Sequence, residues 1–246
     1  ARDFDRLAKS ANASLSQIQL PGLGGLGGAL AGFVSARELV RMTDTWTDLS
    51  SRVGLAVGNM EKAPEVMARI SEMARRTYSS LEATAESWLA NATALRELGM
   101  STGESLDFTE ALNNALVVSG AKAQRAASVQ DALAKAMALG ALSGDQLNTV
   151  IASGGRVAEL LAAELGVNVN QLRKIGGEGK ITGEVIDRAL RGNLALLREE
   201  AEAMPATISD GFLLLKNAVL EYVGSADEGI GASGRLAAAL VFLADN

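Results

Sequence analysis

Cysteine and histidine are both missing from this sequence. Without cysteine the chain has no disulfide framework and no thiol chemistry. The absence of both residues removes the usual ligands of zinc sites, and the absence of histidine removes imidazole-based acid–base catalysis and the triads that depend on it. We therefore expect no enzymatic activity, no catalytic residue, no metal site and no cofactor.

Proline and aromatic residues are scarce, with three prolines and 4% aromatic side chains among 246 residues. Strands of sandwiches and barrels draw on aromatic and β-branched residues. The 48% hydrophobic content comes instead mostly from alanine, leucine, valine, isoleucine and methionine, which pack well on and between helices. We predict an all-α fold of about ten short to medium helices, with antiparallel hairpins. Trp46 and Trp88 lie in apolar helical patterns and are expected to anchor the core.

Positive charge is in short supply, because 23 lysines and arginines face 29 aspartates and glutamates and leave a net charge of −6. A nucleic-acid surface needs clustered lysine and arginine to neutralise phosphates. The stretch GGEGKIT at 176–182 is only superficially like a phosphate-binding loop. Ile181 stands where that loop needs serine or threonine, and Lys174 stands where it needs its first glycine. We predict an ordinary loop between helices and no nucleic-acid partner.

The acidic residues form no arrangement typical of a hydrolase or a calcium site. Glu199, Glu200 and Glu202 are neighbours on one predicted helix, whereas a hydrolase needs one carboxyl group in an apolar pocket and another across a cleft. We expect a solvated helix face there. Asp227, Glu228 and Gly229 lack the alternating oxygen ligands of a calcium loop and are predicted to form a turn.

Helical periodicity continues from about residue 30 to the end, interrupted by glycine and proline. Pairs with the spacing of a capping box, or of its asparagine analogue, mark three helix starts: Ser101 with Glu104, Ser143 with Gln146, and Asn168 with Gln171. Glycines at left-handed caps are predicted to end five helices: Gly99, Gly120, Gly140, Gly166 and Gly224. The predicted helices are 30–57, 64–79, 82–98, 104–118, 122–139, 144–152, 155–165, 169–175, 183–203, 207–223 and 233–244.

The first part of the chain differs from the rest. An apolar stripe predicts an N-terminal helix over 1–20, and a stretch without charge follows, with Gly24, Gly28 and Gly32 at small-xxx-small spacing. We interpret 21–36 as a Gly-rich hinge, because glycine makes it weakly hydrophobic and poorly helical. The alternative is a membrane-active injection module acting through 20–36, since the same spacing lets two membrane helices approach closely.

The remainder, 37–246, is predicted to be one helical domain with a compact short-helix subdomain at 141–182. The chain begins with alanine and ends within an apolar helical pattern, so we expect a segment of a longer protein. No basic stretch precedes an apolar one at the start, as a secretory signal would require.

A series of short motifs lies between residues 132 and 191. An alanine-rich helix is followed by a short acidic turn with Leu-Asn, a helix ending in Leu-Gly-Val, a Leu-Arg pair, and a Glu-Gly-Lys-Ile-Thr turn. In this order and spacing the segment resembles the N-terminal domain of phage tail tape measure proteins. The positions that match the family pattern, as structural or partner-contact residues, are Asp145, Leu147, Asn148, Leu165, Gly166, Leu172, Arg173, Gly179, Lys180 and Thr182.

The resemblance extends in weaker form over about Leu30 to Asn246 and has one departure. The family usually has a proline before the arginine of the stretch that here reads Ser153-Gly154-Gly155-Arg156. This departure leaves the geometry of that turn open.

The resemblance implies a structural role in the tail of a phage or prophage. The full-length proteins are long and largely helical, lie along the tail lumen during assembly and fix the tail length. Implied partners are the tail tube protein, tail assembly chaperones and baseplate or tail-tip proteins. The implied location is the virion tail, with the host bacterial cytoplasm as the place of assembly. Self-association into a homo-oligomer and membrane contact through 20–36 stay open.

An extended helix converts chain length into distance at about 1.5 Å per residue. A chain broken every 10 to 20 residues or so cannot be extended in that way. We therefore expect a folded head or anchor region that helps to initiate tail tube assembly. A murein hydrolase is a further alternative, because some tape measure proteins resemble such enzymes elsewhere in their length, but this segment lacks the buried acid that the chemistry needs.

Overall fold

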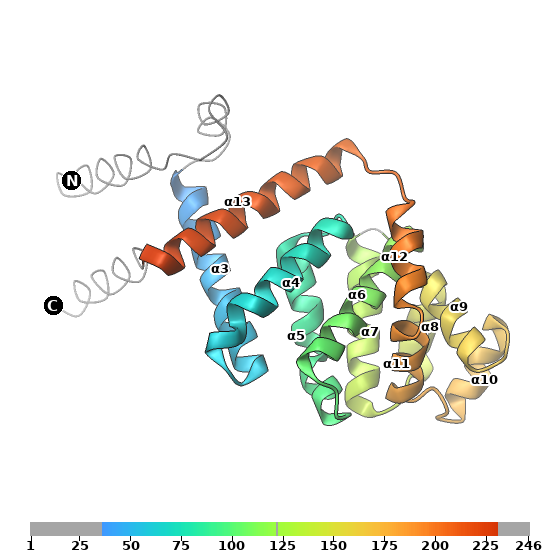
Figure 1. Ribbon diagram of the computed structural model, residues 1–246. Coiled ribbons are helices and arrows are strands. Elements are labelled where there is room, and N and C mark those ends of the chain that lie inside the picture. The colour runs from blue at the N-terminus through green and yellow to red at the C-terminus, as the bar shows by residue number, and fades with distance from the viewer. Residues whose placement is uncertain (1–35, 122, 231–246) are drawn as a thin grey trace. The chain divides into compact units, whose positions relative to one another are not determined.

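The computed structural model describes residues 36–121 and 123–230 and shows an all-α fold, as predicted (Figure 1). Within these ranges there is no strand, and Ala141 and Thr182 form an isolated antiparallel bridge. The α-helices are α3 (Ala36–Val57), α4 (Ala63–Arg76), α5 (Leu81–Glu97), α6 (Thr102–Val118), α7 (Ala123–Leu139), α8 (Gly144–Ser153), α9 (Gly155–Glu164), α10 (Leu172–Gly177), α11 (Gly183–Arg191), α12 (Leu194–Glu202) and α13 (Ile208–Ile230). Short 3-10 helices cover Met60–Lys62 and Val169–Gln171.

Contacts divide the chain into two compact units. The larger unit is Leu49–Ala218, and the described part of the other comprises residues 36–48 and 219–230. The predicted N-terminal helix at 1–20, most of the Gly-rich hinge and the predicted helix at 233–244 lie outside the described residues. These parts of the predicted domain division therefore stay predictions.

Local signals placed most helix ends correctly. Ser101 with Glu104 and Asn168 with Gln171 form complete capping boxes, so both predictions are confirmed. The predicted caps at Gly99, Gly120, Gly140 and Gly166 all have positive φ. Ser143 precedes α8 but its side chain makes no capping hydrogen bond, so that predicted capping box is wrong.

The predicted helix 183–203 is wrong, because the chain breaks into α11 and α12 at Gly192 and Asn193. The Asn193 amide donates to the carbonyl oxygen of Ala189 at 2.8 Å and so satisfies one of the unpaired carbonyls at the end of α11. The apolar spacing continues across the break through Leu190, Leu194 and Leu197. Periodicity alone therefore gives no sign of it.

The end of α13 also differs from the prediction. The helix runs on to Ile230, so Gly224 is not a cap and Asp227, Glu228 and Gly229 do not form a turn. Gly224 lies inside the helix and is buried against Trp46 of α3, whose ring occupies the space that a Cβ would need. The glycine is required here for a close approach rather than for a helix end.

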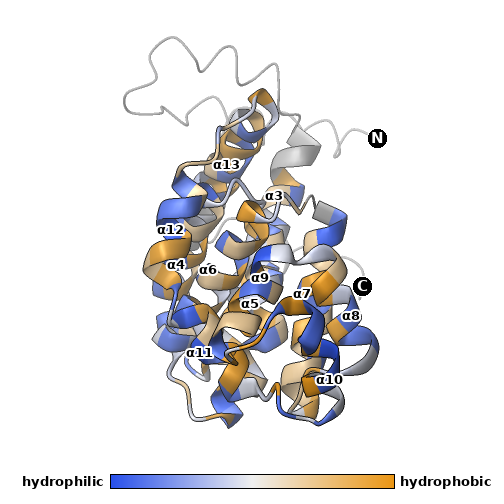
Figure 2. Cartoon of the chain, turned by 90° about the vertical axis from the view of Figure 1, so that its right-hand side faces the viewer, coloured by the Kyte–Doolittle hydropathy of each residue, from blue (hydrophilic) through white to orange (hydrophobic). Residues whose placement is uncertain are grey.

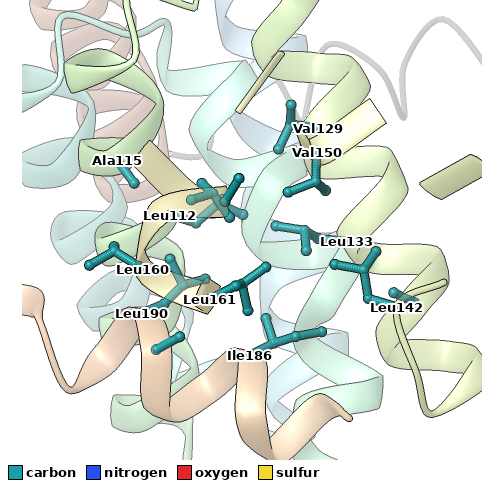
Figure 3. Close-up of a cluster of buried hydrophobic side chains, with 14 of the residues drawn as sticks. Leu112, Ala115, Val129, Leu133, Leu142, Val150, Leu160, Leu161, Ile186 and Leu190 are labelled. Carbon is teal, nitrogen blue, oxygen red and sulfur yellow. The ribbon is translucent and has the colours of Figure 1, made fainter. Parts of the chain in front are cut away.

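The core of the larger unit is built around α6, which is buried on all sides. From Ser105 to Leu116 every residue of α6 except Asp107 is buried, as expected for a central helix rather than an amphipathic surface helix. Neighbours of α6 include α5, α7, α9, α11 and α12. Figure 3 shows apolar side chains from α6, α7, α8, α9 and α11 meeting in one cluster. The cluster's labelled members are Leu112, Ala115, Val129, Leu133, Leu142, Val150, Leu160, Leu161, Ile186 and Leu190.

Both tryptophans are buried, as predicted, with Trp46 at 5% and Trp88 at 1% exposure. The Trp88 indole N–H donates to the Ser105 hydroxyl at 2.9 Å, which satisfies its one polar atom. The helices around the core carry hydrophilic residues beside hydrophobic ones, as the mixed bands along α8 and α10 in Figure 2 show.

The Gly224→Ala substitution should destabilise the protein. The new methyl group would overlap the Trp46 ring, and overpacking of this kind costs about 1–3 kcal/mol. Gly211 lies in the same helix with no atom within 4 Å of a Cβ, so Gly211→Ala should instead stabilise the helix by up to about 1 kcal/mol. Denaturant unfolding followed by tryptophan fluorescence compares the two variants, and equal stability of both would show that the Trp46 contact is absent.

Candidate functional site

The ten family-motif positions lie on α8, on α10, in the turn that follows α9 and in the turn between α10 and α11. Leu147 and Leu172 are buried in the core, at 2% and 0% exposure. On the surface, the Arg173 guanidinium on α10 donates through Nε to the amide oxygen of Asn148 on α8 at 2.9 Å. Both leucines belong to the same core cluster, and the hydrogen bond between Arg173 and Asn148 joins α8 to α10 at the surface.

The remaining motif positions shape turns. Gly166 and Gly179 have φ of +66° and +69°, a conformation that disfavours other residues. Thr182 caps α11, and its hydroxyl accepts from the Val185 N–H at 3.4 Å. Lys180 pairs with Glu178 at 2.7 Å. Asp145 in the first turn of α8 is exposed and Leu165 is half-buried.

The GGEGKIT stretch is a loop between helices over its last residues, as predicted. The Leu142 N–H donates to the Ile181 carbonyl at 2.8 Å, so the loop is held against the start of α8. The motif positions of this loop therefore hold α8, α10 and α11 in place, and a contact between their exposed side chains and a partner stays a prediction.

The Gly176→Ala substitution tests how tightly this region is packed. A Cβ at Gly176 would overlap the Leu147 side chain and lie 3.2 Å from the backbone oxygen of Leu142. We expect a loss of about 1–3 kcal/mol in the free energy of unfolding. The adjacent Gly177 has no atom within 4 Å of a Cβ, so Gly177→Ala is the matched control and should be neutral or stabilising. Calorimetry gives both values, and an unaffected Gly176→Ala variant would contradict the packing.

The departure from the family pattern falls at the junction of α8 and α9. Gly155 is the first residue of α9, is exposed and has open space around it. The first helical position is where proline is best tolerated, so the glycine here and the proline usual in the family suit the same geometry. The following Arg156 is fixed by its backbone N–H, which donates to the Ser119 hydroxyl at 2.9 Å.

The acidic stretch on α12 is only in part the solvated face that its sequence predicts. Glu199 and Glu202 are exposed. Glu200 instead accepts two hydrogen bonds from Arg156, at 2.8 Å from Nε and 2.6 Å from Nη2. This pair joins α12 to α9.

A buried carboxylate on α6 forms a second polar cluster that the sequence did not reveal. The Glu110 side chain is 3% exposed and accepts two hydrogen bonds from Arg198 on α12, at 2.6 Å from Nε and 2.7 Å from Nη2. Arg69 and Arg76 on α4 each approach it to 3.6 Å. Three helices distant in sequence therefore meet at the Glu110 carboxylate. The sequence does not single out this residue, because other polar residues stand beside it in α6.

Charge interactions decide the ionisation of Glu110. Burial raises the pKa of this carboxyl, but the hydrogen bonds and charge of Arg198, with the charges of Arg69 and Arg76, outweigh burial and hold the pKa below its ordinary value. Beside it is a pocket of about 350 Å³, lined by Arg69, Glu72, Met73, Arg76, Glu110 and Arg198. This group of residues is called the arginine pocket below.

The lowered pKa of Glu110 predicts a pH dependence of stability. A carboxyl whose pKa is lower in the folded state contributes stability that is present above its unfolded pKa and is lost as pH falls through the folded pKa. The free energy of unfolding should therefore drop as pH falls below about 4.5. Glu110→Gln cannot titrate, so the variant should lose less stability than the wild type between about pH 6 and about pH 3. Denaturant unfolding at both pH values gives the comparison, and equal losses would contradict the assignment.

The first half of α13 carries an apolar strip that the described residues do not cover. Ile208, Phe212 and Leu215 lie at helical spacing on one face, with exposures of 83%, 66% and 49%. The opposite face is fixed by Asn217, whose amide donates to the Ser79 carbonyl at 2.7 Å and whose oxygen accepts from the Leu81 N–H at 3.1 Å. This part of α13 is thus held at the start of α5 with its apolar strip outward.

The described residues contain neither a candidate metal site nor a candidate membrane span. Among residues 36–121 and 123–230 no group of three or more acidic, histidine or cysteine residues is placed to hold a metal ion. None of the described helices has the length and hydrophobicity needed to cross a membrane. Residues 20–35, on which the membrane alternative depends, lie outside the described part of the chain.

The model of the tape measure protein family matches residues 37–228, which is most of the chain and includes both the motif region and the arginine pocket. The chain belongs to the tape measure protein family. Tape measure proteins are structural, non-enzymatic proteins of phage tails, so this chain is a structural component of a virion tail and associates with other tail components. Neither a curated protein nor a solved structure matches it.

Proposed function

We propose that this chain is a folded N-terminal region of a tape measure protein that helps to initiate assembly of the tail tube, while the whole protein sets the tail length. Its partners in this role are the tail tube protein, tail assembly chaperones and baseplate or tail-tip proteins. Assembly takes place in the host bacterial cytoplasm. Residues 1–20 and 21–36 act as an N-terminal helix and a hinge that precede the helical domain.

The observation that carries the proposal is the family match over a segment that is packed rather than extended. A ruler measures by its length along an extended helix, at about 1.5 Å per residue. Here α6 is buried on all sides by helices from before and after it in the chain. A segment whose helices bury one another in this way cannot serve as an extended ruler without losing its core, and an anchor for other tail proteins suits it better.

The exposed motif residues are the proposed contacts of this anchor. Asn148 on α8 and Arg173 on α10 are hydrogen-bonded to each other at the surface. Asp145 is exposed on α8, and Lys180 is exposed in the turn after α10. Their positions are fixed by the buried Leu147 and by neighbouring core residues. A rigid surface with defined polar groups is what a specific protein contact requires.

Cross-linking of assembling tails tests the proposal. In a phage that encodes this chain, lysines and carboxylates of residues 141–182 should cross-link to a tube, chaperone or baseplate protein, as identified by mass spectrometry. An Asn148→Ala, Arg173→Ala double variant should weaken these cross-links while the purified chain keeps its stability. Cross-links from this segment only to other parts of the same chain would contradict an anchoring role.

A further inference from the structure

We draw no further inference here: the strongest candidate, the exposed apolar strip of Ile208, Phe212 and Leu215 on the first half of α13, carries none because nothing in the structure shows what covers it.

Discussion

Replacing Arg198 with methionine is expected to lower the free energy of unfolding by about 3 kcal/mol or more, because it leaves the Glu110 carboxylate buried without its main partner. Arg198 makes both short hydrogen bonds to this group. Arg69 and Arg76 stand at 3.6 Å and are held by Asp107 and Glu72. They can therefore replace only part of the lost interaction.

The Glu110→Met, Arg198→Met double variant separates the cost of an unpaired charge from the cost of lost packing. With both charged groups replaced by apolar side chains of similar length, most of the stability should return. Arg188→Met is the control, because Arg188 pairs with Glu164 at the surface with its own side chain 56% exposed, and such pairs contribute about 1 kcal/mol or less. Urea unfolding of the four proteins provides the values. A double variant no more stable than Arg198→Met would show that the cluster does not depend on charge pairing.

Deleting residues 144–165 is expected to abolish cooperative unfolding of the domain. The deletion removes α8 and α9 and with them the buried side chains Leu147, Val150, Val157, Ala158, Leu160, Leu161 and Ala162. Loss of one buried leucine costs about 2–5 kcal/mol, whereas the whole net stability of a domain is about 5–15 kcal/mol. The loss thus exceeds what the remaining core can offset.

Calorimetry and one-dimensional proton spectra of the purified deletion variant measure this effect. We expect no calorimetric transition and no dispersed methyl signals. The Gly177→Ala protein, purified in the same way, is the folded control, because no atom lies within 4 Å of the position of its new Cβ. A sharp transition in the deletion variant would show that α8 and α9 form a separate lobe and not part of the core.

Much of the fold follows from the sequence because helix starts and ends depend on nearby residues. Ser101 and Glu104 form their capping box within one turn, and Gly140 takes a left-handed conformation directly after α7. The break between α11 and α12 does not follow from the apolar spacing, which continues across Gly192 and Asn193, so a glycine at that point is not enough to predict it. The prediction that Gly224 ends a helix is wrong. A glycine is needed there because the position packs against Trp46, which is far away in the sequence.

The polar sites depend on tertiary packing in the same way. Glu110 is one of several polar residues on its helix, its partners lie on α4 and α12, and no spacing rule connects positions 69, 110 and 198. The motif positions were identified through the family pattern. The structure adds that Leu147 and Leu172 belong to the core and that Asn148 and Arg173 meet on the surface.

The central claim is that this part of a tape measure protein is a packed structural domain and not a stretch of the ruler. Tail lengths of a phage carrying the 144–165 deletion, measured by electron microscopy, test it most directly. We expect few or no tails, or misassembled ones, because the domain no longer folds. Intact tails shortened by about 33 Å, which is the length of the deleted residues as an extended helix, would contradict the claim.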